Sequence, residues 1–150
     1  MEARLTNPAM LLPEAMKALL TLAAEHGGLP PATVNLVNLR VSQINGCSVC
    51  LEGHARIMKK AGESDERIYT VGGWRDAPYF SDAERAALAL TEAVTRVADR
   101  PDPMPDEIWN EAARHYDERA LGAQLIQIGV INVFNRLNVA TRQVAEAWKP

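Results

Sequence analysis

Apolar side chains recur along most of the chain at the three- and four-residue spacing of an amphipathic α-helix. One face of a helix over residues 32–44 carries Val34, Val37, Val41 and Ile44. The sequence shows no alternating runs of valine, isoleucine and threonine bounded by hairpin turns, the pattern typical of strands. The pattern therefore predicts an all-α fold.

Prolines, glycines and capping residues divide the chain into about seven predicted helices. Pro13 suits the first position of a helix, and Ser64 is a plausible N-cap. Ser81 and Glu84 have the spacing of a capping box. The expected helices cover 13–26, 32–44, 47–61, 65–71, 82–98, 106–114 and a last one from 121 toward Trp148. We expect one bundle-like domain over residues 1–150.

Composition and charge exclude several classes of partner. The chain has 150 residues, of which 47% are hydrophobic and 23% charged, as in globular domains. Its net charge of −3 argues against a nucleic-acid partner, which needs a basic face. No apolar run approaches the ~18 residues that span a bilayer, and the first residues do not resemble a secretory signal. We therefore expect a cytoplasmic protein with no membrane or nucleic-acid partner.

The candidate chemistry lies in Cys47, Cys50 and His54. Two cysteines in a reducing compartment are more typical of redox or metal chemistry than of a structural disulfide. Residues three apart on a helix lie ~5–5.5 Å apart, which suits a disulfide. His54 shares their face one turn later and is placed to act as a base. A helix N-terminus also favours a thiolate.

Two other interpretations of the cysteines remain open at this stage. They are inert small apolar residues, or they bind zinc together with His54 and a fourth ligand such as His115 or His26. Structural zinc sites need four ligands, and no second Cys-x-x-Cys motif follows. The redox interpretation is therefore preferred, with no metal and no bound organic cofactor.

Residues 39–50, with the sequence LRVSQINGCSVC, closely resemble the alkylhydroperoxidase D-like branch of the carboxymuconolactone decarboxylase family. His54, Trp74-Arg75, residues 80–88 and residues 131–138 extend this resemblance. It implies an all-α, homo-oligomeric protein, a trimer or a hexamer, that reduces hydroperoxides. It further implies that Cys50 attacks the peroxide and that Cys47 resolves it as a disulfide. An external dithiol, such as a lipoyl group, would then reduce the enzyme.

The sequence departs from that family at two positions. Asn35 stands where the well-known peroxidases have a proton-relay glutamate, and Val49 stands where they have a histidine between the cysteines. An amide orients a water or a ring but does not take a proton. Glu84 and Glu92 are candidate replacements, although either is equally explained as a cap or a surface charge. The missing glutamate also favours an alternative, a redox sensor or thiol-disulfide exchange protein with weak or no peroxidase turnover.

The apolar stretch over residues 121–133 is relevant to whether the protein forms oligomers. It is apolar on more than one face, at Ile126, Ile128, Val130, Ile131 and Val133. Such a helix is buried either against another subunit or in the centre of its own domain.

Overall fold

The computed structural model describes residues 2–146, and all regular elements in that range are helical. The all-α prediction is therefore confirmed. The α-helices are α1 (Pro8–Leu11), α2 (Pro13–Ala23), α3 (Pro31–Asn45), α4 (Ser48–Lys60), α5 (Asp65–Tyr69), α6 (Asp82–Thr95), α7 (Asp106–His115) and α8 (Glu118–Ala140), with short 3-10 helices η1 (Val71–Gly73) and η2 (Val97–Asp99).

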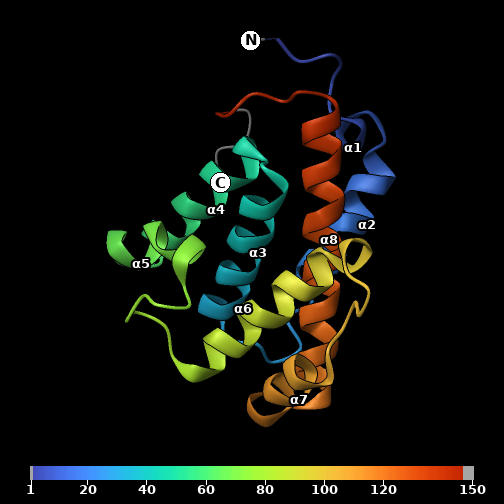
Figure 1. Cartoon of the computed structure of the whole chain (residues 1–150). Coiled ribbons are helices and arrows are strands. Elements are labelled where there is room, and N and C mark those ends of the chain that lie inside the picture. The colour runs from blue at the N-terminus through green and yellow to red at the C-terminus, as the bar shows by residue number, and fades with distance from the viewer. Residues whose placement is uncertain (1, 147–150) are drawn as a thin grey trace.

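Helix α3 is the centre of the bundle, between α4, α6 and α8 (Figure 1). Pro31 occupies its first turn, where the missing N–H costs nothing. Val37 and Val41 are fully buried and pack against Ile128 and Ile131 of α8. These contacts use the apolar face that the valine spacing predicts, and they fix α8 beside α3.

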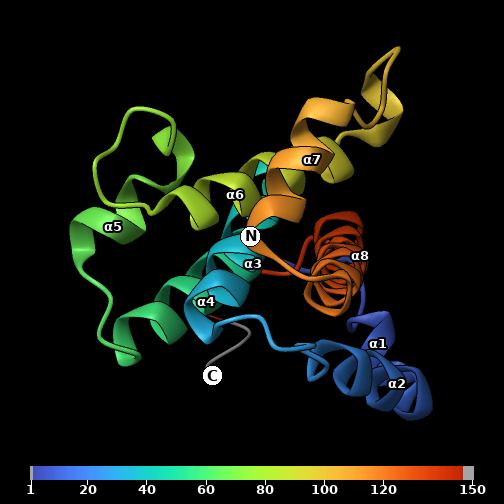
Figure 2. The same ribbon diagram turned by 90° about the horizontal axis from the view of Figure 1, so that it is seen from below.

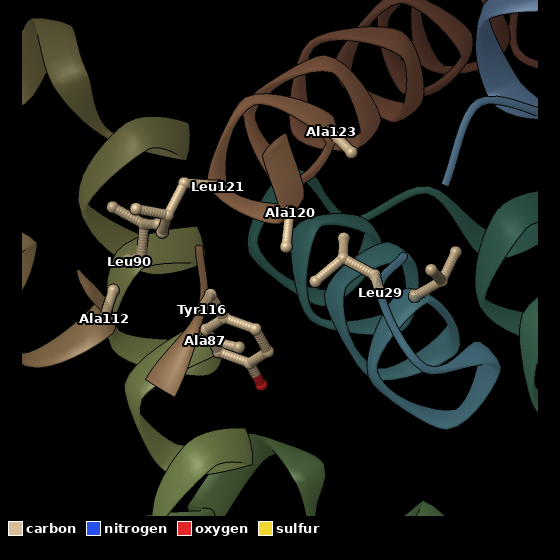
Figure 3. Close-up of a cluster of buried hydrophobic side chains, with 9 residues drawn as sticks. Leu29, Ala87, Leu90, Ala112, Tyr116, Ala120, Leu121 and Ala123 are labelled. Carbon is tan, nitrogen blue, oxygen red and sulfur yellow. The ribbon is translucent and has the colours of Figure 1, made fainter. Parts of the chain in front are cut away.

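A second apolar cluster fastens α6, α7 and the start of α8 to the lower end of α3 (Figure 3). Leu90 of α6 and Leu121 of α8 lie in this cluster with Ala112 of α7. The ring of Tyr116 packs here too, and its hydroxyl donates a hydrogen bond to the Ala83 carbonyl (2.9 Å). Burial of these side chains holds three helices in one arrangement around α3.

The start of α6 has the predicted capping box. The Ser81 hydroxyl accepts the Glu84 N–H (3.3 Å), and the Glu84 carboxylate accepts the Ser81 N–H (2.9 Å). One turn later the Arg85 guanidinium donates to the carbonyl oxygens of Trp74 (2.7 Å) and Phe80 (3.2 Å). These bonds fix the loop before α6.

Several helix boundaries differ from the prediction for local reasons. Helix α1 was not predicted, because its four residues are too few to show a period. Helix α8 begins at Glu118, not 121, because Asp117 caps it by accepting the Ala120 N–H (2.8 Å). That polar first turn lacks the apolar residues used to detect the helix. Trp148, the predicted end of this helix, lies outside the described residues.

Helix α8 lies mostly inside the bundle. Ile128, Val130 and Ile131 are buried within this chain, whereas Ile126 and Val133 remain partly exposed. The central position explains an apolar surface on more than one face. No helix within residues 2–146 is long and apolar enough to cross a membrane.

One group of exposed apolar residues belongs to α1 and α2, which lie at the edge of the bundle beside α8 (Figures 1 and 2). Helix α2 has no buried residue. Leu12 and Leu20 are 61% and 56% exposed, although they are large aliphatic side chains. We call this surface the α1–α2 face; its other exposed members are Met10, Leu11 and Leu22.

Candidate functional site

The two cysteine sulfurs lie at the turn that joins α3 to α4. Gly46 ends α3 with a left-handed φ of 66°, which glycine adopts without strain. The Cys47 N–H then donates to the Ser42 carbonyl (3.1 Å). Cys47 is the N-cap of α4, and its sulfur accepts the Cys50 N–H (3.4 Å). The structure thus brings the predicted pair together, with Cys47 just outside the helix instead of in its first turn.

A third side chain, Asn138 of α8, contacts both sulfurs. Its amide nitrogen lies 3.3 Å from Cys50 Sγ and 3.8 Å from Cys47 Sγ. Its amide oxygen accepts a hydrogen bond from the Asn7 side chain. This second contact fixes the orientation of the amide, so that its N–H groups face the sulfurs.

On the same helix as Asn138, a set of hydrogen-bonded amides joins α8 to α3. Asn45 donates to the side-chain oxygens of Asn132 (2.9 Å) and Asn135 (3.0 Å). Asn135 in turn donates to the Ser42 hydroxyl (3.2 Å). The sequence-based prediction did not include these hydrogen bonds. The signal was present, because asparagines recur at every third position, 132, 135 and 138, of a helix whose second half is otherwise mostly apolar.

The hydrogen bonds around the sulfurs separate the acidities of the two thiols. The Cys50 thiol donates to Cys47, and this bond, with further bonds from the Cys50 N–H and Asn138, outweighs burial and lowers the pKa of Cys47 to about 6. The same thiol-to-thiolate bond, together with burial, raises the pKa of Cys50 above its usual value. Two coupled thiols titrate as a pair, so the pair shares one proton at neutral pH, and the hydrogen bonds to the Cys47 sulfur favour a thiolate there. The order of attack that the family resemblance implies, with Cys50 first, stays a prediction.

His54 lies on α4 one turn beyond Cys50, as predicted, and is 7% exposed. Burial lowers the pKa of its imidazole to about 4, so the ring is neutral at physiological pH. A neutral imidazole accepts a proton, but one with this pKa releases it at once. The role that fits is transient proton transfer, and the thiolate of Cys47 is stabilised by hydrogen bonds instead of by an imidazolium.

A partly open cavity of about 270 Å³ reaches the site between the start of α4 and the end of α8. Cys47 lines this cavity, and Cys50 is not among its lining residues. The described residues around it are Gly46, Cys47, Ser48, Asn138, Val139, Arg142 and Gln143. The sulfur with the lower pKa is therefore the one that a small molecule in the cavity would meet.

Two of the predicted relay residues have other environments. Asn35 lies partly exposed on α3, and its amide provides no titratable group. Glu84 is occupied by the capping box with Ser81 and by an ion pair with Arg67. Of the two roles considered for Glu84, the structure shows the helix cap.

Glu92 is neither a surface charge nor, by its contacts, part of the thiol site. It is 3% exposed and binds Arg40 (2.6 Å), Arg75 (2.8 Å) and the Trp74 indole N–H (2.9 Å). Burial alone would raise the pKa of this carboxyl, but these hydrogen bonds lower it to about 2. The prediction of a surface charge is wrong, because the isolated sequence does not show that two arginines and a tryptophan converge here.

The described residues do not provide a set of zinc ligands. Within residues 2–146, no three side chains of His, Cys, Asp or Glu lie close enough together to hold a metal ion. His115, one candidate fourth ligand, instead contacts the Glu111 carboxylate (3.2 Å) at the end of α7.

Comparison with known proteins identifies relatives over most of the chain. The model of the carboxymuconolactone decarboxylase family matches residues 11–93. The uncharacterized protein YdfG of Bacillus subtilis is 33% identical over 132 residues, which are 87% of this chain and 88% of YdfG. Alkyl hydroperoxide reductase AhpD of a Bradyrhizobium species is 42% identical over 48 residues, 32% of this chain and 26% of that protein.

Solved structures show the same fold. A protein of unknown function from Agrobacterium tumefaciens, whose name suggests an antioxidant defence protein AhpD, superposes with a TM-score of 0.88 at 32% identity. The match covers 96% of this chain and 98% of that one. The debrominase Bmp8 superposes with a TM-score of 0.78 at 23% identity, over 90% of this chain and 73% of Bmp8. The latter likeness concerns the fold alone.

The first prediction concerns the acidity of Cys47. In the reduced protein, the rate of alkylation by iodoacetamide should rise with pH around a midpoint of about 6, because the thiolate forms above the lowered pKa. Asn138→Leu should move this midpoint upward by about one pH unit, since a hydrogen bond to a charged group is lost. Thr70→Val is the control, because the Thr70 hydroxyl bonds the Glu66 carbonyl away from the cysteines and its loss should leave the midpoint unchanged. A wild-type midpoint near 8.5, the ordinary value, would contradict this account.

The second prediction separates a structural Glu92 from a proton relay. Glu92→Gln should lower the free energy of unfolding in urea at pH 7 by about 2 kcal/mol, because Arg40 loses a buried charged partner. The folded pKa lies below the ordinary one, so this difference should be present at pH 7 and should shrink as pH falls toward 2. The alkylation midpoint of Cys47 should stay in place. A relay role would instead show as a shifted midpoint with little loss of stability.

Proposed function

The chain belongs to the alkylhydroperoxidase D-like part of the carboxymuconolactone decarboxylase family, and on that premise we propose that it is a hydroperoxide-reducing dithiol enzyme. The observation that carries this proposal is the hydrogen-bonded pair Cys47–Cys50 at the N-terminus of α4, with Asn138 on both sulfurs. Family membership alone does not select the activity, since the fold is shared with a debrominase.

The proposed cycle begins with the Cys47 thiolate. Its sulfur attacks the terminal oxygen of a hydroperoxide, so that an S–O bond forms and the O–O bond breaks. The alkoxide leaves as an alcohol after taking a proton, for which the Cys50 thiol is the nearest donor. Cys47 is thereby oxidised to a sulfenic acid, and the peroxide is reduced.

Cys50 completes the oxidation. As a thiolate it attacks the sulfenic sulfur of Cys47, an S–S bond forms, and hydroxide leaves and is protonated to water. In this proposal His54, one turn further along α4, passes protons during these steps. Asn138 would stabilise each thiolate in turn, because its amide contacts both sulfurs.

An external dithiol would close the cycle. One donor thiolate attacks the Cys47–Cys50 disulfide, and the second donor thiol displaces the enzyme sulfur, so that the donor leaves as a disulfide. A lipoyl group is a dithiol of the right class. The alternative of a redox sensor rests on Asn35, which leaves the family's relay position without a carboxylate.

The third prediction tests turnover. With an excess of a dithiol reductant, the reduced protein should consume many equivalents of cumene hydroperoxide. Cys47→Ser and Cys50→Ser should each lower kcat/KM by about 10³-fold or more, because the nucleophile or its partner is lost. Thr70→Val removes a hydroxyl that bonds the Glu66 carbonyl away from the cavity and should retain most of the activity. Consumption of a single equivalent by the wild type would indicate a sensor, and unchanged turnover in either cysteine variant would exclude the cycle.

We also propose that the α1–α2 face is covered by another copy of this chain. Five exposed apolar side chains lie on two adjacent short helices and the residue between them, and exposed apolar surface of this kind marks an interface. The homo-oligomer implied by the family resemblance, a trimer or hexamer, would bury it.

The fourth prediction concerns this assembly. Light scattering should give a mass that is a multiple of 16.5 kDa. Leu12→Glu together with Leu20→Glu should shift the protein to monomers, because each change buries an unpaired charge at the interface. Val97→Glu is a matched control, since Val97 is 53% exposed outside this face. A wild-type monomer, or an assembly insensitive to the double substitution, would show that the α1–α2 face is not the interface.

A further inference from the structure

The cavity beside Cys47 carries a positive charge that the proposed peroxide chemistry does not use. Arg142 follows the end of α8 and lines the cavity together with Cys47. Among the described lining residues it carries the only positive charge, and no carboxylate accompanies it. This local charge contrasts with the net charge of −3 of the whole chain.

The backbone at Arg142 is also unusual. Its φ of 54° lies in the left-handed region, which a residue with a Cβ adopts only at a cost. Hydrogen bonds on both sides hold the segment there. The Arg142 N–H donates to Val139 (3.1 Å), and the Gln143 side chain donates to the Leu5 carbonyl (2.8 Å). The fold therefore keeps the start of this arginine side chain at the cavity wall and leaves its head exposed.

The remaining polar groups of the cavity suit an oxygen-rich ligand. Ser48 supplies a hydroxyl, and Asn138 lies beside the sulfur. The Gln143 side chain donates to the Leu5 carbonyl and the Thr141 hydroxyl, so it shapes the wall and does not donate to a ligand. Val139 provides the apolar part of the wall. A small organic molecule with an anionic group fits this lining better than a neutral, wholly apolar one, because only the anion gains from the guanidinium.

We propose that this cavity selects substrates that carry an anionic group, such as a carboxylated organic hydroperoxide, by pairing that group with Arg142 while Cys47 faces the reacting end. The inference rests on the proposed function for the peroxide itself. The charge selection, however, applies to any reagent that reaches Cys47 through the cavity. Arg142 acts here as a specificity-determining residue and takes no part in the electron transfer.

The fifth prediction uses two alkylating reagents of nearly equal size that differ in charge, iodoacetate and iodoacetamide. The measured quantity is the ratio of their rate constants at Cys47 in the reduced protein, assigned by fragmentation of the tryptic peptide 41–56. Both reagents meet the same thiolate, so the ratio is independent of its pKa. Arg142→Gln should lower the iodoacetate-to-iodoacetamide ratio by about threefold, the scale of an exposed charge pair, and Arg142→Lys should retain most of it.

Arg119→Gln is the matched control, because it removes the same charge from an exposed position at the opposite end of α8. It should leave the ratio unchanged. The loss in Arg142→Gln should also diminish at 0.5 M salt, since exposed pairs are screened. Equal ratios in wild type and Arg142→Gln, or an equal fall in Arg119→Gln, would overturn the assignment of Arg142.

A second measurement extends the test to turnover. With a fatty-acid hydroperoxide and its methyl ester as substrates, Arg142→Gln should raise KM for the acid about threefold and leave kcat for both substrates and KM for the ester unchanged. The two experiments fail separately. A protein without peroxidase turnover that still shows the alkylation preference would refute the proposed function and retain the anion-selective cavity. Turnover without any charge preference would support the proposed function and refute the anion-selective cavity.

Discussion

The site depends on one hydrogen bond, from the Cys50 N–H to the Cys47 sulfur. The first N–H groups of any helix have no partner within it, and most helices satisfy them with a serine, threonine or aspartate oxygen. In α4 a cysteine holds that position, so the capping atom and the reactive atom are the same. A thiolate is a better acceptor than a thiol, which means that the helix itself favours the ionised form of Cys47. The Cys-x-x-Cys spacing then places the second thiol where it donates to the same sulfur.

The sulfurs keep this arrangement because buried amides join α3 to α8. Buried polar side chains are costly unless every one finds a partner, and the requirement is directional. Asn45, Asn135 and Ser42 satisfy one another across the two helices. Asn138, one turn beyond Asn135 on α8, is thereby set at the level of Cys50. These hydrogen bonds add a directional contact to the apolar packing between α3 and α8.

Local sequence signals predicted those parts of the molecule that local physics controls. The valine spacing of α3, the capping box at Ser81 and the shared face of Cys47 and Cys50 all follow from residues within a few positions of one another. What was missed involves partners far apart along the chain. Asn138 reaches the sulfurs from 88 residues further on, and Glu92 meets Arg40 across 52 residues. The different surroundings of the two cysteines were likewise not readable from their spacing, because they depend on which sulfur caps the helix and which lines the cavity.

The same hydrogen bonds also bear on the redox balance of the pair. In the reduced protein the charge on Cys47 is stabilised by Cys50 and by Asn138. In a disulfide neither sulfur is ionised, so these charge-assisted bonds weaken and α4 loses most of its cap. Stabilising the reduced form in this way makes the disulfide a stronger oxidant, as in oxidoreductases with acidic thiols. A pair of this kind is readily reduced by an external dithiol, and the low pKa that speeds attack on an oxidant also favours return to the starting state.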